Sequence, residues 1–214
     1  MINMELRNKR FVFLGDSITE GYGIACQDNI YHQVLKKEYN LELACNCGVG
    51  GSRIARQKTP TYVSMKEDLF FALRAEVMPR DVDAVVVFGG TNDSGHGDAD
   101  LGDIDSNDDY TFNGALNNLI NKLKYDYPNK EIIFLTPIHR VNEHLCMNGT
   151  GYILNDYVNC IIEACKRHNI HLIDLFNELE LNPYDVNLVP DGLHPNELGH
   201  SIMADFIGKK LMEI

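Results

Sequence analysis

The chain has 214 residues and a net charge of −12, a balance that excludes a large basic surface for nucleic acid and disfavours anionic membranes and anionic substrates. Hydrophobic residues (44%) and charged residues (23%) occur in globular proportions, so we expect one folded domain over residues 1–214. The charged start lacks a signal-peptide core, no apolar run is long enough for a membrane span, and the six cysteines form no zinc or disulfide pattern. These features predict a cytoplasmic protein with free thiols.

Apolar and amphipathic segments alternate along the chain and predict its secondary structure. In chain order we expect a strand at 10–15, a helix at 29–39, a strand at 41–45, a helix at 64–78, a strand at 83–90, a helix at 112–126, a strand at 131–137, a helix at 152–169, a strand at 170–176 and a helix at 198–211. The strand around Val85 is apolar on both faces, as a parallel strand covered by helices should be. The alternation predicts a five-stranded parallel sheet in a three-layer α/β/α fold.

One long segment, residues 94–109, has no apolar periodicity and contains six aspartates. A loop of this length in a compact domain usually serves a function, so we expect an active-site loop or lid. Calcium binding is an alternative, but the segment fails the EF-hand pattern because Gly102 stands at its fifth position and no glutamate closes it. We therefore predict no metal site.

Four short motifs follow predicted strands or open the last helix, where parallel α/β sheets bind their ligands. Gly15-Asp16-Ser17 follows the first strand, NCGVGGS (46–52) the second and GGTND (89–93) the third, while DGLHPNELGH (191–200) opens the last helix. Any one of these motifs is weak evidence, because short patterns arise by chance. Four of them, each after the expected element, are a strong signal.

Together the motifs strongly resemble those of the SGNH/GDSL hydrolases, a family of esterases and acylhydrolases. The family's serine, glycine, asparagine, histidine and acid correspond here to Ser17, Gly51, Asn92, His194 and Asp191. The matching blocks stand in the family's order and span residues 15–194. The one departure is Ile18, where the family name has leucine, another aliphatic residue. The resemblance implies a flavodoxin-like α/β/α fold.

The residue types also support this chemistry by themselves. A serine hydroxyl needs a base to become a nucleophile, and histidine, which titrates near neutrality, suits that role. A carboxylate on the other ring nitrogen fixes the tautomer and stabilises the imidazolium. We expect Ser17, His194 and Asp191 to act in this way, with Asp191 and His194 in one short turn. Pro195 then suits the first position of the following helix.

An oxyanion formed on the substrate needs hydrogen-bond donors aimed at it. The candidates are the backbone N–H groups of Ser17 and Gly51 and the side-chain amide of Asn92. Gly50 remains an alternative to Gly51, since both occur in the same turn.

Other residues near the motifs have open roles. Asp174 follows the fifth strand and is a rival for the triad acid, although the G-x-S-x-G elbow that accompanies such an arrangement is absent. His96, His139 and Asp16 are candidates for lining the substrate site. For each of them, a purely structural role is the alternative to contact with the substrate. Asp16 and Asp93 suit hydrogen bonds that stabilise turns.

The sequence thus predicts a serine esterase that acts on small neutral carboxylic esters without a cofactor, with acetylated carbohydrates as the preferred substrate class. A lysophospholipase or thioesterase with a longer acyl pocket is the first alternative. A catalytically idle carbohydrate-binding protein is the second, although all four reactive positions are filled. We expect a monomer or a small homo-oligomer.

Overall fold

The computed structural model describes residues 5–59 and 70–214. Its strands are β1 Arg10–Gly15, β2 Leu43–Gly48, β3 Ala84–Phe88, β4 Glu131–Leu135 and β5 His171–Ile173. All pairs are parallel, and the strand order is β2-β1-β3-β4-β5. Gly15 is aligned with Gly48 on one side and with Phe88 on the other, so the first three strands end at the same level. The loops that carry three of the four motifs therefore start side by side.

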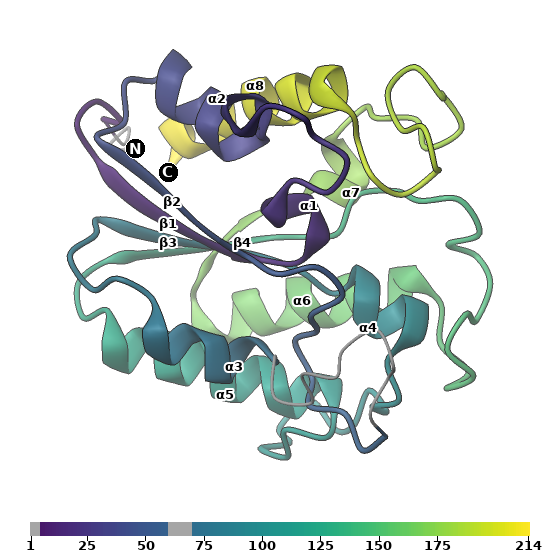
Figure 1. Cartoon of the computed structure of the whole chain (residues 1–214). Helices are drawn as coiled ribbons and strands as arrows, with labels where there is room; N and C mark the ends of the chain where they lie inside the picture. The colour runs from purple at the N-terminus through teal and green to yellow at the C-terminus, as the bar shows by residue number, and fades with distance from the viewer. Residues whose placement is uncertain (1–4, 60–69) are drawn as a thin grey trace.

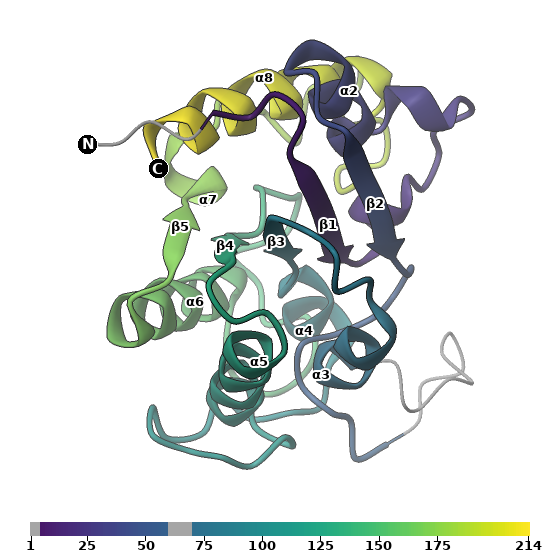
Figure 2. The ribbon, with the colours of Figure 1, turned by 90° about the vertical axis from the view of Figure 1, so that its left-hand side faces the viewer.

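Helices cover both faces of this sheet and give the predicted three-layer α/β/α fold (Figures 1 and 2). The layer over one face contains α2 (Tyr31–Glu38) and α8 (Glu197–Glu213), and the layer over the other contains α3 (Phe71–Arg74), α5 (Phe112–Asp126) and α6 (Leu154–His168). Shorter elements are α1 (Ser17–Glu20), α4 (Thr91–His96), α7 (Leu175–Glu178) and the 3-10 helices η1 (Gln27–Asn29) and η2 (Ala75–Val77).

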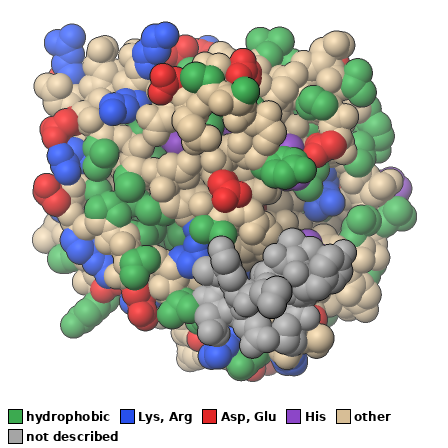
Figure 3. All heavy atoms as spheres, in the orientation of Figure 1, with side chains coloured by type: hydrophobic (Ala, Val, Ile, Leu, Met, Phe, Trp, Pro, Cys, Tyr) green, Lys and Arg blue, Asp and Glu red, His purple; other side chains and the backbone are tan. Residues whose placement is uncertain are grey.

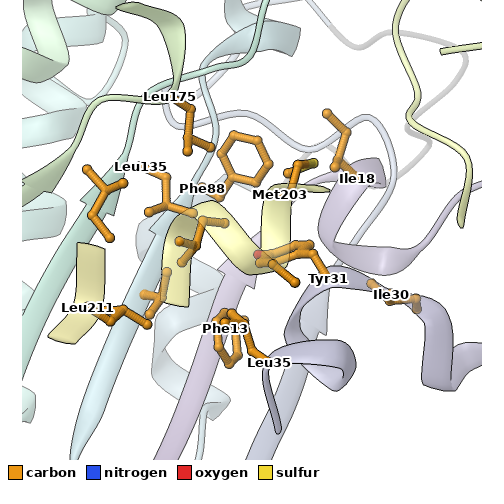
Figure 4. Packing of buried hydrophobic residues seen from close by; sticks show 14 of the residues in the cluster. Phe13, Ile18, Ile30, Tyr31, Leu35, Phe88, Leu135, Leu175, Met203 and Leu211 are labelled. Carbon is orange, nitrogen blue, oxygen red and sulfur yellow. The ribbon is translucent and has the colours of Figure 1, made fainter. Parts of the chain in front are cut away.

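The sheet separates two hydrophobic cores, because successive residues of a strand point to opposite faces. Phe11 and Phe13 of β1 belong to the core under α2 and α8, and Val12 and Leu14 belong to the core under α5 and α6. Figure 4 shows the first core, where Tyr31 of α2 and residues of α8 meet the sheet. Burial on both faces explains why these strands read as continuous apolar runs.

The predicted elements and the observed ones agree closely where the local pattern is strong. The helix at 112–126 and the strand at 10–15 have the predicted bounds. The fifth strand is shorter than the predicted 170–176 because Asp174 ends it and caps α7 by accepting a hydrogen bond from Asn177 N.

Two other segments depart from the prediction. Of the helix predicted at 64–78, residues 64–69 lie outside the described residues, and the rest forms only α3 and η2. The segment predicted as a loop from residue 94 begins inside α4.

On the face shown in Figure 3, basic and acidic side chains are interspersed, and hydrophobic ones are scattered. Within the two described ranges, every helix is too short or too polar to cross a membrane.

Candidate active site

Ser17 is placed at the carboxyl end of β1, which lies between β2 and β3 in the sheet. The strand ends at Gly15, and the side chain of Asp16 caps α1 by accepting a 3.0 Å hydrogen bond from Ile18 N. Ser17 is thus the first residue of α1 and is only 7% exposed. Burial raises the pKa of Asp16 to about 7, against the lowering effect of the Ile18 hydrogen bond. Asp16 therefore stabilises the turn that presents the serine.

The turn before α8 places Asp191 and His194 together. Asp191 Oδ1 accepts hydrogen bonds from Leu193 N (2.9 Å) and His194 N (2.7 Å), while Oδ2 lies 2.7 Å from His194 Nδ1. Gly192 has a φ of 76°, and a side chain there would also collide with Val141. This tight turn therefore depends on glycine.

Asp191 and Ser17 contact opposite nitrogens of the His194 ring. Ser17 Oγ lies 2.9 Å from His194 Nε2, although the two residues are 177 positions apart in the sequence. A carboxylate can only accept from Nδ1–H, which leaves Nε2 to accept the serine proton. Burial would raise the pKa of Asp191, but the hydrogen bonds from the His194 backbone and ring and from Leu193 N outweigh it and lower that pKa. Asp191 is thus held in its ionised form.

The start of α8 differs from the prediction for Pro195. The N-cap is Asn196, whose side chain accepts a hydrogen bond from Gly199 N, so the helix begins at Glu197. Pro195 therefore precedes the cap, because asparagine is a strong N-cap residue and takes that position. His194 lies outside the helix.

The turn after β2 lies beside Ser17. The tip of β2 passes so close to α1 that a Cβ on Gly48 would stand 2.1 Å from Glu20 N. Gly50 N donates a 2.9 Å hydrogen bond to Glu20 Oε2. The N–H groups of Ser17 and Gly51, in contrast, meet no acceptor within residues 5–59 and 70–214. These two N–H groups are therefore available to a ligand, whereas that of Gly50 is occupied.

Helix α4, which follows β3, contributes a buried polar cluster. Asn92 Nδ2 donates to Ser52 O over 3.0 Å, which places its amide against the same turn. Asp93 Oδ2 and Oδ1 accept from Ile54 N (3.0 Å) and Ala55 N (2.9 Å). Burial raises the pKa of Asp93 to about 6, although these hydrogen bonds lower it. Asp93 thus ties α4 to the segment that follows the β2 turn.

The model of the GDSL-like lipase/acylhydrolase family matches residues 13–202, most of the chain. The chain belongs to this family. It is an ester hydrolase, as the motifs predict. Among curated proteins, no match is found.

Solved structures of similar proteins share the fold over nearly the whole chain. A Lactobacillus plantarum protein is 29% identical, with a TM-score of 0.82 over 96% of this chain and 97% of that one. The lipase/acylhydrolase from Enterococcus faecalis is 23% identical, with a TM-score of 0.66 over 96% of each chain. An acetyl xylan esterase, AlAXEase, is 22% identical, with a TM-score of 0.64 over 94% of this chain and 98% of that one.

The remaining candidate residues of this GDSL-like hydrolase have partners away from the serine. Asp174 Oδ1 accepts from Thr136 Oγ1 and Asn177 N, so its carboxylate caps α7 and has no contact with His194. His139 Nδ1 lies 2.8 Å from Glu143 Oε1, and its ring packs on Phe176 at 4.1 Å between centroids.

His96 lies nearer to the motif residues. Its Nε2 is 3.1 Å from Asn92 Oδ1 and its Nδ1 is 2.9 Å from an Arg53 nitrogen. Both ring nitrogens are therefore engaged by protein groups.

Hydrogen bonds and an ion pair hold the acidic segment, residues 94–109, against helices α5 and α6. Asn113 and Asn117 of α5 donate to Gly102 O and Ile104 O, and Arg167 pairs with Asp105. Arg167 is near the end of α6, which leads into the amino end of β5. Ser17, in contrast, follows the carboxyl end of β1. In the described ranges, no three His, Cys, Asp or Glu side chains gather as a metal site requires.

A residue that the sequence reasoning missed, Tyr22, borders the site. Its ring is 58% exposed and lies 4.4 Å from the imidazole of His194, measured between centroids. A cavity of about 220 Å³ opens here, lined by Tyr22, Pro190 and Pro195 beside His194. The sequence signal that could have identified Tyr22 is its position, five residues after Ser17 and just beyond α1. A larger cavity of about 390 Å³, next to Lys9 and His171, lies at the amino ends of the strands and far from these groups.

Proposed function

We propose that Ser17, His194 and Asp191 form the catalytic triad of a serine esterase that works through an acyl-enzyme. The observation that carries this proposal is the continuous contact from Ser17 Oγ through both nitrogens of His194 to the Asp191 carboxylate. In the first step Ser17 Oγ attacks the ester carbonyl, and its proton passes to His194 Nε2 and then to the leaving alcohol. In the second step His194 takes a proton from water, the resulting hydroxide attacks the acyl group, and the proton returns to Ser17.

The oxyanion of both tetrahedral intermediates would be bound by the N–H groups of Ser17 and Gly51 and by the Asn92 amide. The geometry supports Gly51 over Gly50, because Gly50 N already donates to Glu20. No cofactor enters this chemistry.

The substrate we propose is a short acyl ester, acetyl above all, of a neutral polyhydroxylated alcohol. His194 protonates the leaving oxygen, so the alcohol must lie on the His194 side of Ser17, where the 220 Å³ cavity opens. The exposed ring of Tyr22 offers a flat apolar surface to a sugar ring there. The similarity to an acetyl xylan esterase is in line with this substrate class. We assign the loop aspartates no contact with the substrate, since hydrogen bonds and an ion pair hold the middle of that loop against α5 and α6.

The test is a series of p-nitrophenyl esters from acetate to dodecanoate, followed by acetylated sugars. We expect kcat/KM to be highest for acyl groups of about two to four carbons, which is what the short-chain proposal requires. An optimum at about eight carbons or more would replace the short-chain proposal with the lysophospholipase or thioesterase alternative. A fluorophosphonate that labels the wild type but not Ser17→Ala tests the nucleophile separately.

All six cysteines are unpaired, which the reducing cytosol would maintain. We therefore propose a cytoplasmic enzyme whose partner is its small-molecule ester, present as a monomer or small homo-oligomer.

A further inference from the structure

A directed chain of hydrogen bonds runs from Arg53 to the proposed oxyanion hole. Arg53 lies against His96 Nδ1 at 2.9 Å, His96 Nε2 lies against Asn92 Oδ1 at 3.1 Å, and Asn92 Nδ2 donates to Ser52 O at 3.0 Å. Arg53 and Asn92 are each 5% exposed. These hydrogen bonds link the segment after the β2 turn to α4, the helix that follows β3.

The chemistry of the partners fixes the proton positions along this chain. A guanidinium can only donate, so His96 Nδ1 accepts and the ring proton stands on Nε2. Nε2–H then donates to Asn92 Oδ1, and the NH₂ group of Asn92 faces Ser52 O, which can only accept. Turning the Asn92 amide over would set a donor against Nε2–H and an oxygen against a carbonyl. The amide therefore has one allowed orientation.

The environment also keeps His96 in the neutral form that this chain needs. Burial, together with the nearby charges of Arg53 and Arg140, lowers the pKa of His96 to about 4. Protonation of Nδ1 would replace its accepted hydrogen bond with a contact between two donors. His96 consequently stays an Nε2–H donor throughout the pH range in which a serine hydrolase works.

We propose that His96 is a positioning residue that, with Arg53 behind it, holds the Asn92 amide so that its second N–H points to the substrate oxyanion. One Nδ2 proton is used by Ser52 O, and the other stays free for the reaction. A donor fixed before the reaction stabilises the transition state without reorganisation. This inference rests on the proposed function, since it assigns a residue that acts through Asn92. It also gives His96 a structural role in place of direct substrate contact.

The test is a double-mutant cycle on kcat with p-nitrophenyl acetate, using His96→Leu, Asn92→Ala and the double variant. We expect His96→Leu to lower kcat by roughly 10- to 100-fold with KM changed by less than about 3-fold. In the Asn92→Ala background, the same substitution should cost less than about 2-fold, because the group that it positions is gone. His96→Gln, whose amide can donate to Asn92 Oδ1, should recover part of kcat.

A matched control is available where α6 leads into the edge strand β5. His168 Nε2 lies 2.9 Å from Asn117 Oδ1, the same pairing of imidazole and asparagine, but between α6 and α5 and away from Ser17. His168→Leu should leave kcat within about 2-fold of the wild type. If His96→Leu does not fold, His96→Gln in both backgrounds provides the cycle.

The outcomes separate the two proposals. If Asn92→Ala lowers kcat and His96→Leu does not, or if the two losses multiply independently, the positioning role is overturned and the triad stands. If Asn92→Ala leaves kcat unchanged, the oxyanion assignment fails and the role of His96 fails with it. A loss of Ser17 dependence would instead overturn the esterase mechanism.

Discussion

The carboxylate of Asp191 holds His194 at two points, the backbone N–H through Oδ1 and the ring Nδ1 through Oδ2, each at 2.7 Å. One side chain thus fixes both the position of the turn and the orientation of the imidazole. Because the two residues are three apart, this arrangement forms within a single turn, and only the approach of Ser17 depends on the rest of the fold.

Replacing Asp191 with asparagine should lower kcat by roughly 10³- to 10⁴-fold, because an amide can favour the wrong ring tautomer and does not stabilise the imidazolium. The comparison is Asp174→Asn, which should keep kcat, since asparagine caps a helix as well as aspartate does. Steady-state kinetics on both variants checks this. The reverse ranking would move the acid to the end of β5.

Ser17→Ala should lower kcat by about 10⁴-fold or more and leave the fold intact. The hydroxyl contributes one hydrogen bond, to His194, and alanine fits the same space. Turnover would be measured with p-nitrophenyl acetate, and the fold by urea unfolding. Near-wild-type turnover in a pure variant would contradict the mechanism.

Asn92→Ala should lower kcat by roughly 10²- to 10³-fold with a smaller change in KM, because a donor to the oxyanion gains strength only as charge develops. Stopped assays over a range of substrate concentration separate the two constants. An effect on KM alone would show that Asn92 merely holds the substrate.

Tyr22→Ala should raise KM for an acetylated sugar by about 5- to 10-fold, the loss expected for one ring contact. With methyl acetate, whose alcohol is too small to reach the ring, kcat/KM should change by less than about 2-fold. Tyr184→Ala is the control, since Tyr184 is 66% exposed but does not line the cavity. Equal losses in both variants would rule out an alcohol subsite at Tyr22.

Buried His32 should make the fold sensitive to acid. Burial of the fully enclosed ring lowers the pKa of His32 to about 4, against the raising effect of its hydrogen bond to Thr19 O. The unfolded chain, in which the imidazole has its ordinary pKa near 6.5, binds the proton first. Stability from this group is therefore complete above about pH 7 and is lost as the pH falls toward 4.

The measurement is the free energy of unfolding in urea at a series of pH values. Between pH 7 and 4.5, the free energy of unfolding of His32→Gln should fall by about 2 kcal/mol less than that of the wild type. Parallel pH curves for the two proteins would show that His32 does not titrate on unfolding in this range.

The sequence alone determined the parts of this protein that depend on short spacings. Two-sided apolar runs such as Val85–Phe88 marked the strands, and the position of three motifs directly after strands predicted the end of the sheet where the site lies. The pairing of Asp191 with His194 could be predicted because it spans one turn. The family followed from the same motifs.

Only the tertiary structure decided which groups are occupied and which are free. The engagement of Gly50 N by Glu20, the chain from Arg53 through His96 to Asn92, and the ring of Tyr22 on His194 each join segments far apart in the sequence. Periodicity and spacing report on neighbours along the chain. The direction of an N–H or a side-chain amide depends instead on which loops the strand order brings together and on how tightly their backbones pack.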